Sequence, residues 1–385
     1  MMLGYSVVRS NDVDENLRQL EGEFRRYAQE AGFSEATGAE VSAVLVMTGG
    51  TERSIVEFAS GSKAVLLFYH GSSNSLAAAS EAAALLNEVG ARVWLYHVSE
   101  AGYVIRQAAN AARAYSGLRG LQITSFGGPS DWLVYSDGKG DLLGASVRVV
   151  PLERLVSEAE SAAPEGLDLR PASIEGVNEA DLRKTLALLN ALKRIAGGGP
   201  LTVRCFDLLR LYGVTPCLPL ALLNSRGLVA GCEGDVPSLL TMYIASSISG
   251  RPAWMGNVTP GPEPGTIGLV HCTFPVSEAS TYSLTTHFET GRPLAVRAEV
   301  PEGRQATLTK YDPRTRTLRA IRATVKYGRQ FTKACRTQAV FSVSQEAVRL
   351  TLTRPLGAHY VAVLDDIMPG LRVFSALAGI KLEEA

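Results

Sequence analysis

Residues 230–238, with the sequence AGCEGDVPS, contain the end of an apolar strand, an acidic residue and the start of a helix. Asp235 is a favourable N-cap residue, Pro237 suits the first helical turn, and Gly250 predicts the end of the helix. Ligands of α/β proteins bind beyond the carboxyl ends of the strands, which is where this pattern puts Glu233. Glu233 is therefore a candidate metal ligand or proton carrier, and a capping or salt-bridged glutamate is the alternative.

Strand and helix patterns alternate on both sides of this stretch. Four short apolar runs separated by helical patterns precede residue 150, and a second alternating series extends to about residue 271. From about residue 283 the segments become short and alternate in polarity, which predicts antiparallel strands. We expect two doubly wound parallel-sheet α/β domains, at 1–162 and 163–282, and a small antiparallel β-barrel with a closing helix at 283–385.

Composition restricts the class of protein. The chain has 385 residues, of which 46% are hydrophobic and 20% charged, values typical of a folded, soluble protein with more than one domain. No apolar run reaches the length of a membrane span and no secretory signal is evident, so we expect a cytoplasmic protein. The five cysteines form no CxxC pair and their number is odd, which favours reduced thiols and does not indicate a disulfide framework or a zinc site.

Charge is unevenly distributed along the chain. The formal net charge is zero, but residues 292–336 contain 12 Lys and Arg against 3 acidic residues. Such a stretch is compatible with nucleic acid, a phosphorylated substrate or a subunit interface, and a solvated β-surface is the alternative. Few aromatic residues lie between the basic ones, which argues against a platform for single-stranded nucleic acid.

Three histidines of the second half lie where predicted strands begin or end. His271 ends an apolar run, His287 shares one face of a strand with Glu289, and His359 precedes the last strand. Histidines and carboxylates from several strand ends can converge on one divalent metal ion. No local spacing requires this convergence, so core or surface histidines are the alternative.

From about residue 178 onward the sequence resembles the L-fucose isomerase-like proteins, which are related to L-fucose and L-arabinose isomerases. The matching motifs cover about half of the chain in the order of the family. They are LTVRCFD at 201–207, GCEGD at 231–235, LTM at 240–242, WMGN at 254–257, VHCT at 270–273, THFETG at 286–291, CRTQ at 335–338 and GAHY at 357–360.

The resemblance implies a metal site, with manganese bound by a Glu, an Asp and a His in the fucose isomerases. Glu233 and His359 match two of these ligands, but the position 24 residues after Glu233 is Asn257. An amide can offer its carbonyl oxygen to a metal ion but cannot act as a base near neutral pH. A second departure is Ala358, which stands where the fucose isomerases have an Asn that contacts substrate.

Other residues of the motifs complete the expected site. The resemblance implies that His271 is a further metal ligand and that His287 contacts substrate. Asn257 would be a weak metal ligand or a contact to a substrate hydroxyl. Glu289 would be the second proton carrier beside Glu233, with a metal-bound water as the alternative. Arg204 and Arg336 would hold hydroxyls or an anionic group of the substrate, with structural salt bridges as the alternative.

The resemblance thus implies an aldose–ketose isomerase that acts on an open-chain sugar through an enediol, with a divalent metal such as Mn²⁺. Related isomerases build their sites between subunits, which implies a homotrimer or homohexamer. A sugar-binding paralogue that has lost its acid–base pair is the second hypothesis, favoured by Asn257 and Ala358. A nucleic-acid-associated protein that uses residues 292–336 is the third.

Overall fold

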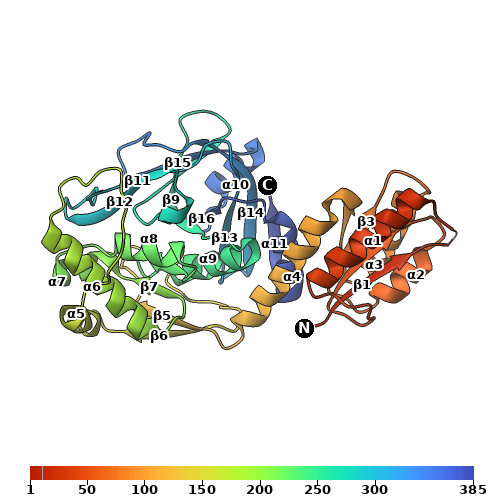
Figure 1. The fold of residues 1–385 in the computed structure, drawn as a ribbon, viewed down its shortest axis with the longest axis horizontal. Helices are drawn as coiled ribbons and strands as arrows, with labels where there is room; N and C mark the ends of the chain where they lie inside the picture. Colours follow the sequence, from red (N-terminus) through yellow and green to blue (C-terminus); the bar gives the residue numbers. More distant parts are fainter. Residues whose placement is uncertain (11) are drawn as a thin grey trace. The chain divides into compact units, whose positions relative to one another are not determined.

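The computed structural model describes residues 1–10 and 12–385, and the chain divides into two compact units (Figure 1). Unit 1 comprises Met1–Ser116 and Pro369–Ile380, and unit 2 comprises Gly117–Met368 and Lys381–Ala385. The mixed α/β class expected from the sequence is confirmed. The three domains with boundaries after residues 162 and 282 stay a prediction.

Unit 1 contains a four-stranded parallel sheet in the order β1-β2-β3-β4. Valines of β2 and β3 pack against the alanine-rich side of α3, and on the other face Phe68 contacts Phe24 of α1. Helices on both faces explain why these strands are continuous apolar runs in the sequence. The elements are β1 (Leu3–Val8), α1 (Glu15–Glu30), β2 (Val41–Val46), α2 (Glu52–Ala59), β3 (Ala64–Tyr69), α3 (Ser75–Glu88), β4 (Arg92–His97), the short helix η1 (Val98–Glu100) and most of α4 (Ala101–Leu118) and α11 (Met368–Ala378).

Unit 2 contains a second parallel sheet in the order β6-β5-β7-β8. β5 was expected to join the first sheet; that expectation is wrong, because β5 pairs with β6 and β7. The strand order reverses between β5 and β7, and the carboxyl edge at such a reversal is where doubly wound sheets bind ligands. The elements are β5 (Gln122–Phe126), β6 (Ser146–Val150), α5 (Leu152–Ser161), α6 (Glu179–Ala196), β7 (Leu201–Val203), α7 (Cys205–Tyr212), α8 (Cys217–Ser225), β8 (Ala230–Cys232) and α9 (Val236–Ser249).

The third sheet, also in unit 2, is largely antiparallel and has the order β13-β16-β9-β10-β15-β14-β17, with a further pairing of β13 with β14. Antiparallel strands after residue 283 are confirmed, and a closed barrel stays a prediction. β10 was expected in the second α/β domain; it belongs to this sheet instead, between β9 and β15. The elements are β9 (Trp254–Pro260), β10 (Thr266–His271), the short helix η2 (Val276–Glu278), a hairpin of β11 (Thr281–Thr286) and β12 (Pro293–Glu299), β13 (Gln305–Asp312), β14 (Thr317–Tyr327), β15 (Thr337–Ser342), α10 (Gln345–Thr353), β16 (His359–Val363) and β17 (Lys381–Glu384).

Helix α9 connects the two sheets of unit 2. It begins at the N-cap Asp235 and ends at Gly250, whose φ is 72°, as the sequence predicts. It packs against β8 of the parallel sheet and against β13 and β16 of the antiparallel sheet, and most of its residues are buried. Its N-terminus therefore lies where the carboxyl edge of β8 meets the antiparallel strands.

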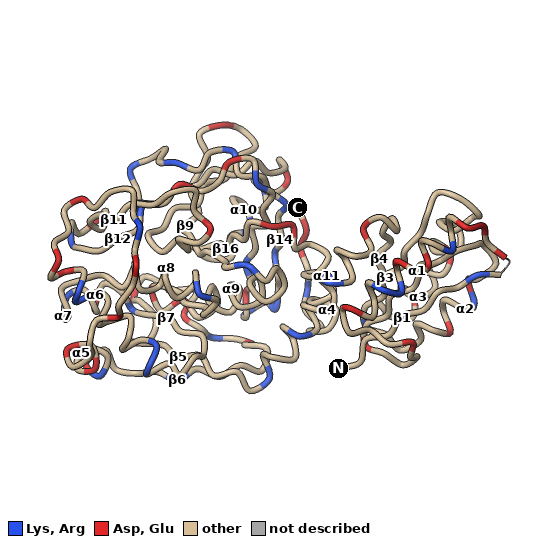
Figure 2. The backbone as a smooth tube through the Cα atoms, in the orientation of Figure 1, with Lys and Arg blue, Asp and Glu red and all other residues tan. Residues whose placement is uncertain are grey.

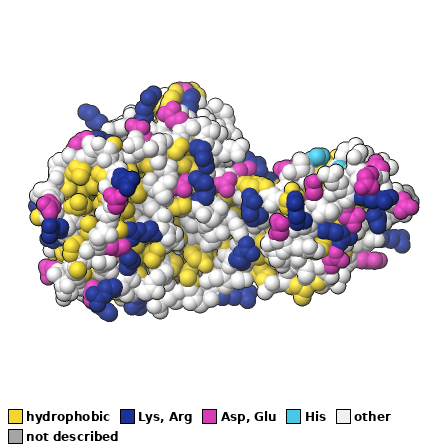
Figure 3. Space-filling view, in the orientation of Figure 1, with side chains coloured by type: hydrophobic (Ala, Val, Ile, Leu, Met, Phe, Trp, Pro, Cys, Tyr) yellow, Lys and Arg dark blue, Asp and Glu magenta, His cyan; other side chains and the backbone are white. Residues whose placement is uncertain are grey.

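The basic stretch at 292–336 is largely neutralised inside unit 2. Seven of its basic residues form ion pairs with carboxylates, and Figure 2 marks both kinds of residue along the chain. The pairs are Arg297–Glu175, Lys310–Asp235, Arg314–Asp137, Arg316–Asp141, Arg319–Glu383, Arg322–Asp366 and Lys326–Glu263. On the face drawn in Figure 3, basic and acidic side chains are intermixed. This pairing does not favour a nucleic-acid surface.

Across residues 1–10 and 12–385, no helix has both the length and the apolar character needed to cross a membrane.

Candidate active site

Glu233 lies directly after β8 in a turn that is fastened to the loop after β5. Its backbone has φ 62°, an uncommon conformation for a residue with a side chain, and its carbonyl accepts a hydrogen bond of 2.9 Å from the amide of Ser130. The next residue, Gly234, has φ 71°, and a Cβ there would lie 2.1 Å from the carbonyl oxygen of Gly128. The turn thus requires glycine and fixes the direction of the Glu233 side chain.

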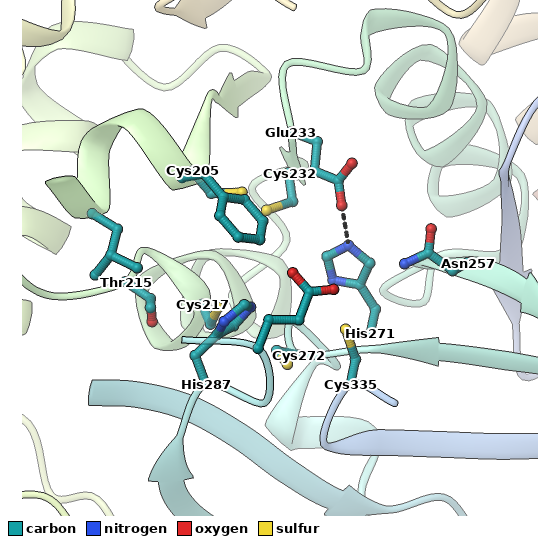
Figure 4. Close-up of a pocket in the computed structure, with 13 residues that line it drawn as sticks. Cys205, Thr215, Cys217, Cys232, Glu233, Asn257, His271, Cys272, His287 and Cys335 are labelled. Carbon is teal, nitrogen blue, oxygen red and sulfur yellow. Dashed lines mark ion pairs between the residues drawn. The ribbon is translucent and has the colours of Figure 1, made fainter. Parts of the chain in front are cut away.

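The Glu233 carboxylate faces the imidazoles of His271, which Figure 4 draws, and of His359. Oε1 lies 3.4 Å from Nε2 of His271 and 3.5 Å from Nε2 of His359. Oε2 accepts a hydrogen bond of 2.6 Å from the indole of Trp132. All three of Glu233, His271 and His359 are buried. The fold therefore gathers one carboxylate and two imidazoles in a site from which most water is excluded.

The pairing of strands β16, β9 and β10 places His359 and His271 next to Glu233. His359 begins β16 and lies opposite Asn257 of β9, and Asn257 lies opposite Val270 of β10, next to His271. In Figure 4 the Asn257 side chain extends towards the His271 ring. Residues that are about 90 and 100 positions apart in sequence thus become neighbours through the register of three adjacent strands.

Asp235 orients the imidazole of His359. Nδ1 of His359 donates a hydrogen bond of 2.9 Å to Oδ2 of Asp235, because a carboxylate can only accept. Asp235 also caps α9 by accepting from the amide and the hydroxyl of Ser238, and Nζ of the buried Lys310 lies 3.6 Å away. With Nδ1 held by Asp235, Nε2 of His359 faces Glu233, which is the arrangement of a carboxylate–histidine pair behind a metal site.

The ionisation of these groups follows from their mutual contacts. Burial alone would raise the pKa of Glu233, but His271 and His359 hold this pKa well below its usual range. Burial likewise opposes ionisation of Asp235, whose pKa Lys310 and His359 nevertheless lower to about 2. Burial lowers the pKa of His359, yet Asp235 and Glu233 together raise it to about 9. The two ionised carboxylates, Glu233 and Asp235, therefore favour a positive charge at this site.

The same atoms fit a metal ion. Among the described residues, Nε2 of His271 and Nε2 of His359 have no hydrogen-bond partner although both are buried, which is costly unless a cation or water is bound. The donor atoms of Glu233, His271 and His359 all lie within 4.8 Å of one another. Two donors separated by 3.4–3.5 Å match two ligands of one cation bound at about 2.1 Å. These buried groups could therefore hold a metal ion.

Further predicted site residues line the same pocket. Asn257, His287 and Glu289 do so together with Glu233 and His271. Burial, then His271 and Arg336, lower the pKa of His287 to about 4, and its ring packs edge-on to Phe206. Glu289 is exposed. Asn257, His287 and Glu289 are therefore placed where a ligand of Glu233 would contact them.

The two predicted arginines do not line this pocket. Arg204 donates to Asp131 at 2.7 Å and to the carbonyl of Pro129 at 2.9 Å, and it also pairs with Asp207. Arg336 donates to the carbonyl of Thr286 at 2.8 Å. Both guanidinium groups hold loops that border the site; whether they also contact substrate stays a prediction.

Sequence reasoning missed several residues that shape the site. Trp132 carries no motif signal beyond its place after β5, and Asp235 was identified only as a helix cap. Lys310 was counted in the basic stretch, yet it is buried beside Asp235. The position of Asp235 two residues after Glu233 is the one signal that could have linked these groups.

The fold and this site define an α/β protein with a buried Glu–His–His cluster at the carboxyl edge of a parallel sheet. No family model matches the chain. A segment of 129 residues is 28% identical to a protein described as sulfoquinovose isomerase from Clostridium sp. (strain MSTE9). The match covers 31% of this chain and 29% of that relative, so it spans less than a third of the relative's length. It supports a distant relationship to a sugar isomerase and does not single out the fucose isomerases.

Proposed function

We propose that the protein is a metal-dependent sugar isomerase that interconverts an aldose and a ketose through an enediol of the open-chain sugar. The observation that carries this proposal is the buried cluster of Glu233, His271 and His359, whose two Nε2 atoms face one carboxylate oxygen. The similarity to a sulfoquinovose isomerase supports the same class of reaction.

The proposed metal ligands are Glu233, His271 and His359, with the amide oxygen of Asn257 as a weaker fourth ligand and Mn²⁺ as the metal. When bound, a divalent cation would draw electron density from two neighbouring sugar oxygens and make the proton at C2 more acidic. Asp235 keeps His359 in the tautomer that offers Nε2, and Trp132 holds the second oxygen of Glu233. These contacts fix the site before substrate enters.

Proton transfer between C1 and C2 requires groups that accept and return a proton. Glu233 is one such group in the proposal, because its carboxylate lies in the pocket. Glu289 is the second, because it lines the same pocket and is exposed. Asn257 cannot take this role because an amide is not a base near neutral pH.

Substrate entry requires a change at the rim of the pocket. The cavity has a volume of about 40 Å³, which is room for a few waters or a metal ion rather than for a hexose. Glu289 lines this pocket and is exposed, so its side chain has room to move when a sugar binds.

The test is solvent-deuterium incorporation at C2 of a sugar, followed by mass spectrometry or NMR, in protein loaded with Mn²⁺. The panel contains sulfoquinovose, L-fucose, L-arabinose and other aldoses with their ketoses. We expect exchange with at least one sugar and a loss of 100-fold or more in Glu233→Gln, about the effect of removing an acid–base group. Glu263→Gln, which changes a glutamate paired with Lys326 on the surface, should keep full exchange.

If no sugar of the panel exchanged deuterium at C2, the proposed isomerase activity would be wrong. If calorimetry on the same sugars showed binding without exchange, the non-catalytic paralogue would replace it.

A further inference from the structure

All five cysteines of the chain line one pocket. Cys205, Cys217, Cys232, Cys272 and Cys335 are distributed over 131 positions of the sequence, yet each contributes to the wall of the cavity that also contains Glu233 (Figure 4). They are free thiols, and four of the five are buried. No metal-binding motif in the sequence predicts this cluster, because no two of these cysteines are fewer than 12 residues apart.

Two of these thiols and an imidazole form a compact group. The ligand atoms of Cys217, Cys272 and His287 all lie within 4.8 Å of one another, and all three residues are buried. Nδ1 of His287 lies 3.2 Å from the hydroxyl of Thr290, which fixes the orientation of the ring. Three ligands thus converge from elements that the sequence separates by up to 70 residues.

Cys335 supplies a fourth sulfur next to this group. Its side chain packs against those of Cys217 and Cys272. The pairing of β10 with β15 brings Cys272 and Cys335 together, because His271 lies opposite Thr337 and the amide of Arg336 donates to the sulfur of Cys272 at 3.4 Å.

We propose that Cys217, Cys272, Cys335 and His287 form a second metal site, which binds a thiophilic divalent cation of the Zn²⁺ class. The ligand set, three sulfurs and one imidazole, is that of a closed structural zinc site. It differs from the Glu233 site, whose oxygen and nitrogen ligands suit harder cations such as Mn²⁺. On binding, the three thiols release their protons to solvent and bind as thiolates.

The second site would stabilise the wall that carries the first one. Its ligands come from the start of α8, the residue after β10, the segment after β11 and the segment before β15. Because Cys272 directly follows His271, a cation held by Cys272 would also fix the end of β10 on which His271 lies. His287, which the sequence assigned to substrate, becomes a ligand of this site.

The test uses the full chain, stripped of metal with a chelator, kept under argon with a phosphine reductant and titrated with Co²⁺. Thiolate ligation gives a sulfur-to-cobalt charge-transfer absorption in the near ultraviolet, which oxygen and nitrogen ligands do not give. We expect this absorption to saturate at an intensity that corresponds to one thiolate-bound Co²⁺ per chain in the wild-type protein. It should disappear when Zn²⁺ is added and be lost in Cys272→Ser. Cys205→Ser, a matched change of a buried cysteine outside the group, should retain it, and so should Glu233→Gln.

The result does not depend on the proposed isomerase, because Glu233 is not a ligand of the second site. No charge-transfer absorption in the reduced wild-type protein, or an equal absorption in Cys272→Ser, would overturn the proposal. Should Cys272→Ser fail to fold, Cys335→Ser changes a half-buried residue and should weaken the absorption. An unchanged spectrum of Cys335→Ser would show that Cys335 is not a ligand, and the proposal of a closed four-ligand site would then be wrong.

Discussion

At the scale of single residues, Glu233 owes its properties to neighbours that are distant in sequence. Trp132 binds one carboxylate oxygen and two histidines face the other. A glutamate in the same GCEGD motif without these neighbours would be an ordinary acid near a helix cap. Asn257 is the residue where this chain departs from the expected metal ligands, so its effect can be tested directly.

Asn257→Asp should tighten Mn²⁺ binding roughly tenfold, because a second carboxylate adds ligand charge next to Glu233. Isothermal titration with Mn²⁺ measures the change. Asn257→Ala is the matched control and should weaken binding or leave it unaltered. Equal affinities of the wild-type protein and Asn257→Asp would show that position 257 does not face the metal.

At the scale of secondary-structure elements, the N-terminus of α9 carries two functions on one side chain. Asp235 caps the helix and also holds His359 in place, with buried Lys310 nearby. Replacing it by asparagine keeps a good cap residue and removes only the charge. The two functions can therefore be separated by one substitution.

Asp235→Asn should lower Mn²⁺ affinity about 10- to 100-fold, as loss of an outer carboxylate does at other metal sites. It should also lower the free energy of unfolding by about 3 kcal/mol, because Lys310 and His359 lose a buried counter-charge. Titration calorimetry and urea denaturation measure the two effects. Asp14→Asn, the same change at the exposed N-cap of α1, should leave Mn²⁺ binding intact and stability within about 0.5 kcal/mol.

The edge strand β17 offers a test of pH dependence outside the site. Glu383 lies opposite Arg319 in the parallel pairing with β14 and accepts from this fully buried guanidinium at 2.9 Å. Although burial opposes ionisation, Lys381 and Arg319 lower the pKa of Glu383 to about 2, from an ordinary value of 4.5. A carboxyl group whose pKa is lowered by folding stabilises the folded state at pH values above its pKa in the unfolded chain. This stabilisation is lost as the pH falls towards its pKa in the folded protein.

Glu383→Gln should therefore reduce the free energy of unfolding at pH 7 by about 3 kcal/mol, since Arg319 remains buried without its carboxylate. The difference from the wild-type protein should shrink as pH falls from 4.5 to 2. Urea midpoints measured across this range provide the data. Glu346→Gln, at an exposed pair with Arg349, should change stability little at any pH, and a constant difference for Glu383→Gln would contradict the assigned pKa.

At the scale of the whole molecule, all residues of both candidate metal sites belong to unit 2. Unit 1 has its own parallel sheet and core, and α11 returns to it near the end of the chain, where Phe374 contacts Tyr115. Ligand binding should therefore stabilise one unit directly, by mass action on its folded state.

Hydrogen–deuterium exchange with and without Mn²⁺ should show slower exchange around residues 230–236, 255–258, 270–273 and 357–361. Peptides from residues 1–116 should exchange at unchanged rates. Protection that is equal in both units would contradict a site confined to unit 2. Mg²⁺ at the same concentration is the control for non-specific ion effects, because it prefers oxygen ligands to imidazole.

Local sequence patterns are sufficient to predict the alternation of strands and helices, the cap and end of α9 and the place of Glu233 after a strand. These features depend on local periodicity and on backbone preferences of Asp, Pro and Gly, which act over a few residues. The sequence also identified Glu233, His271, His359 and Asn257 as site candidates, chiefly through the resemblance of their motifs.

Which strands share a sheet and which side chains meet depends instead on long-range contacts in the folded chain. β5 joins β7, and β9 and β10 join the antiparallel sheet, because pairing depends on packing between segments far apart in the chain. The same long-range pairing brings Trp132 and Asp235 to the Glu–His–His cluster and gathers five scattered cysteines in one pocket. The spacing of residues along the sequence does not predict such contacts, because strand register and loop closure are fixed only when the whole core has formed.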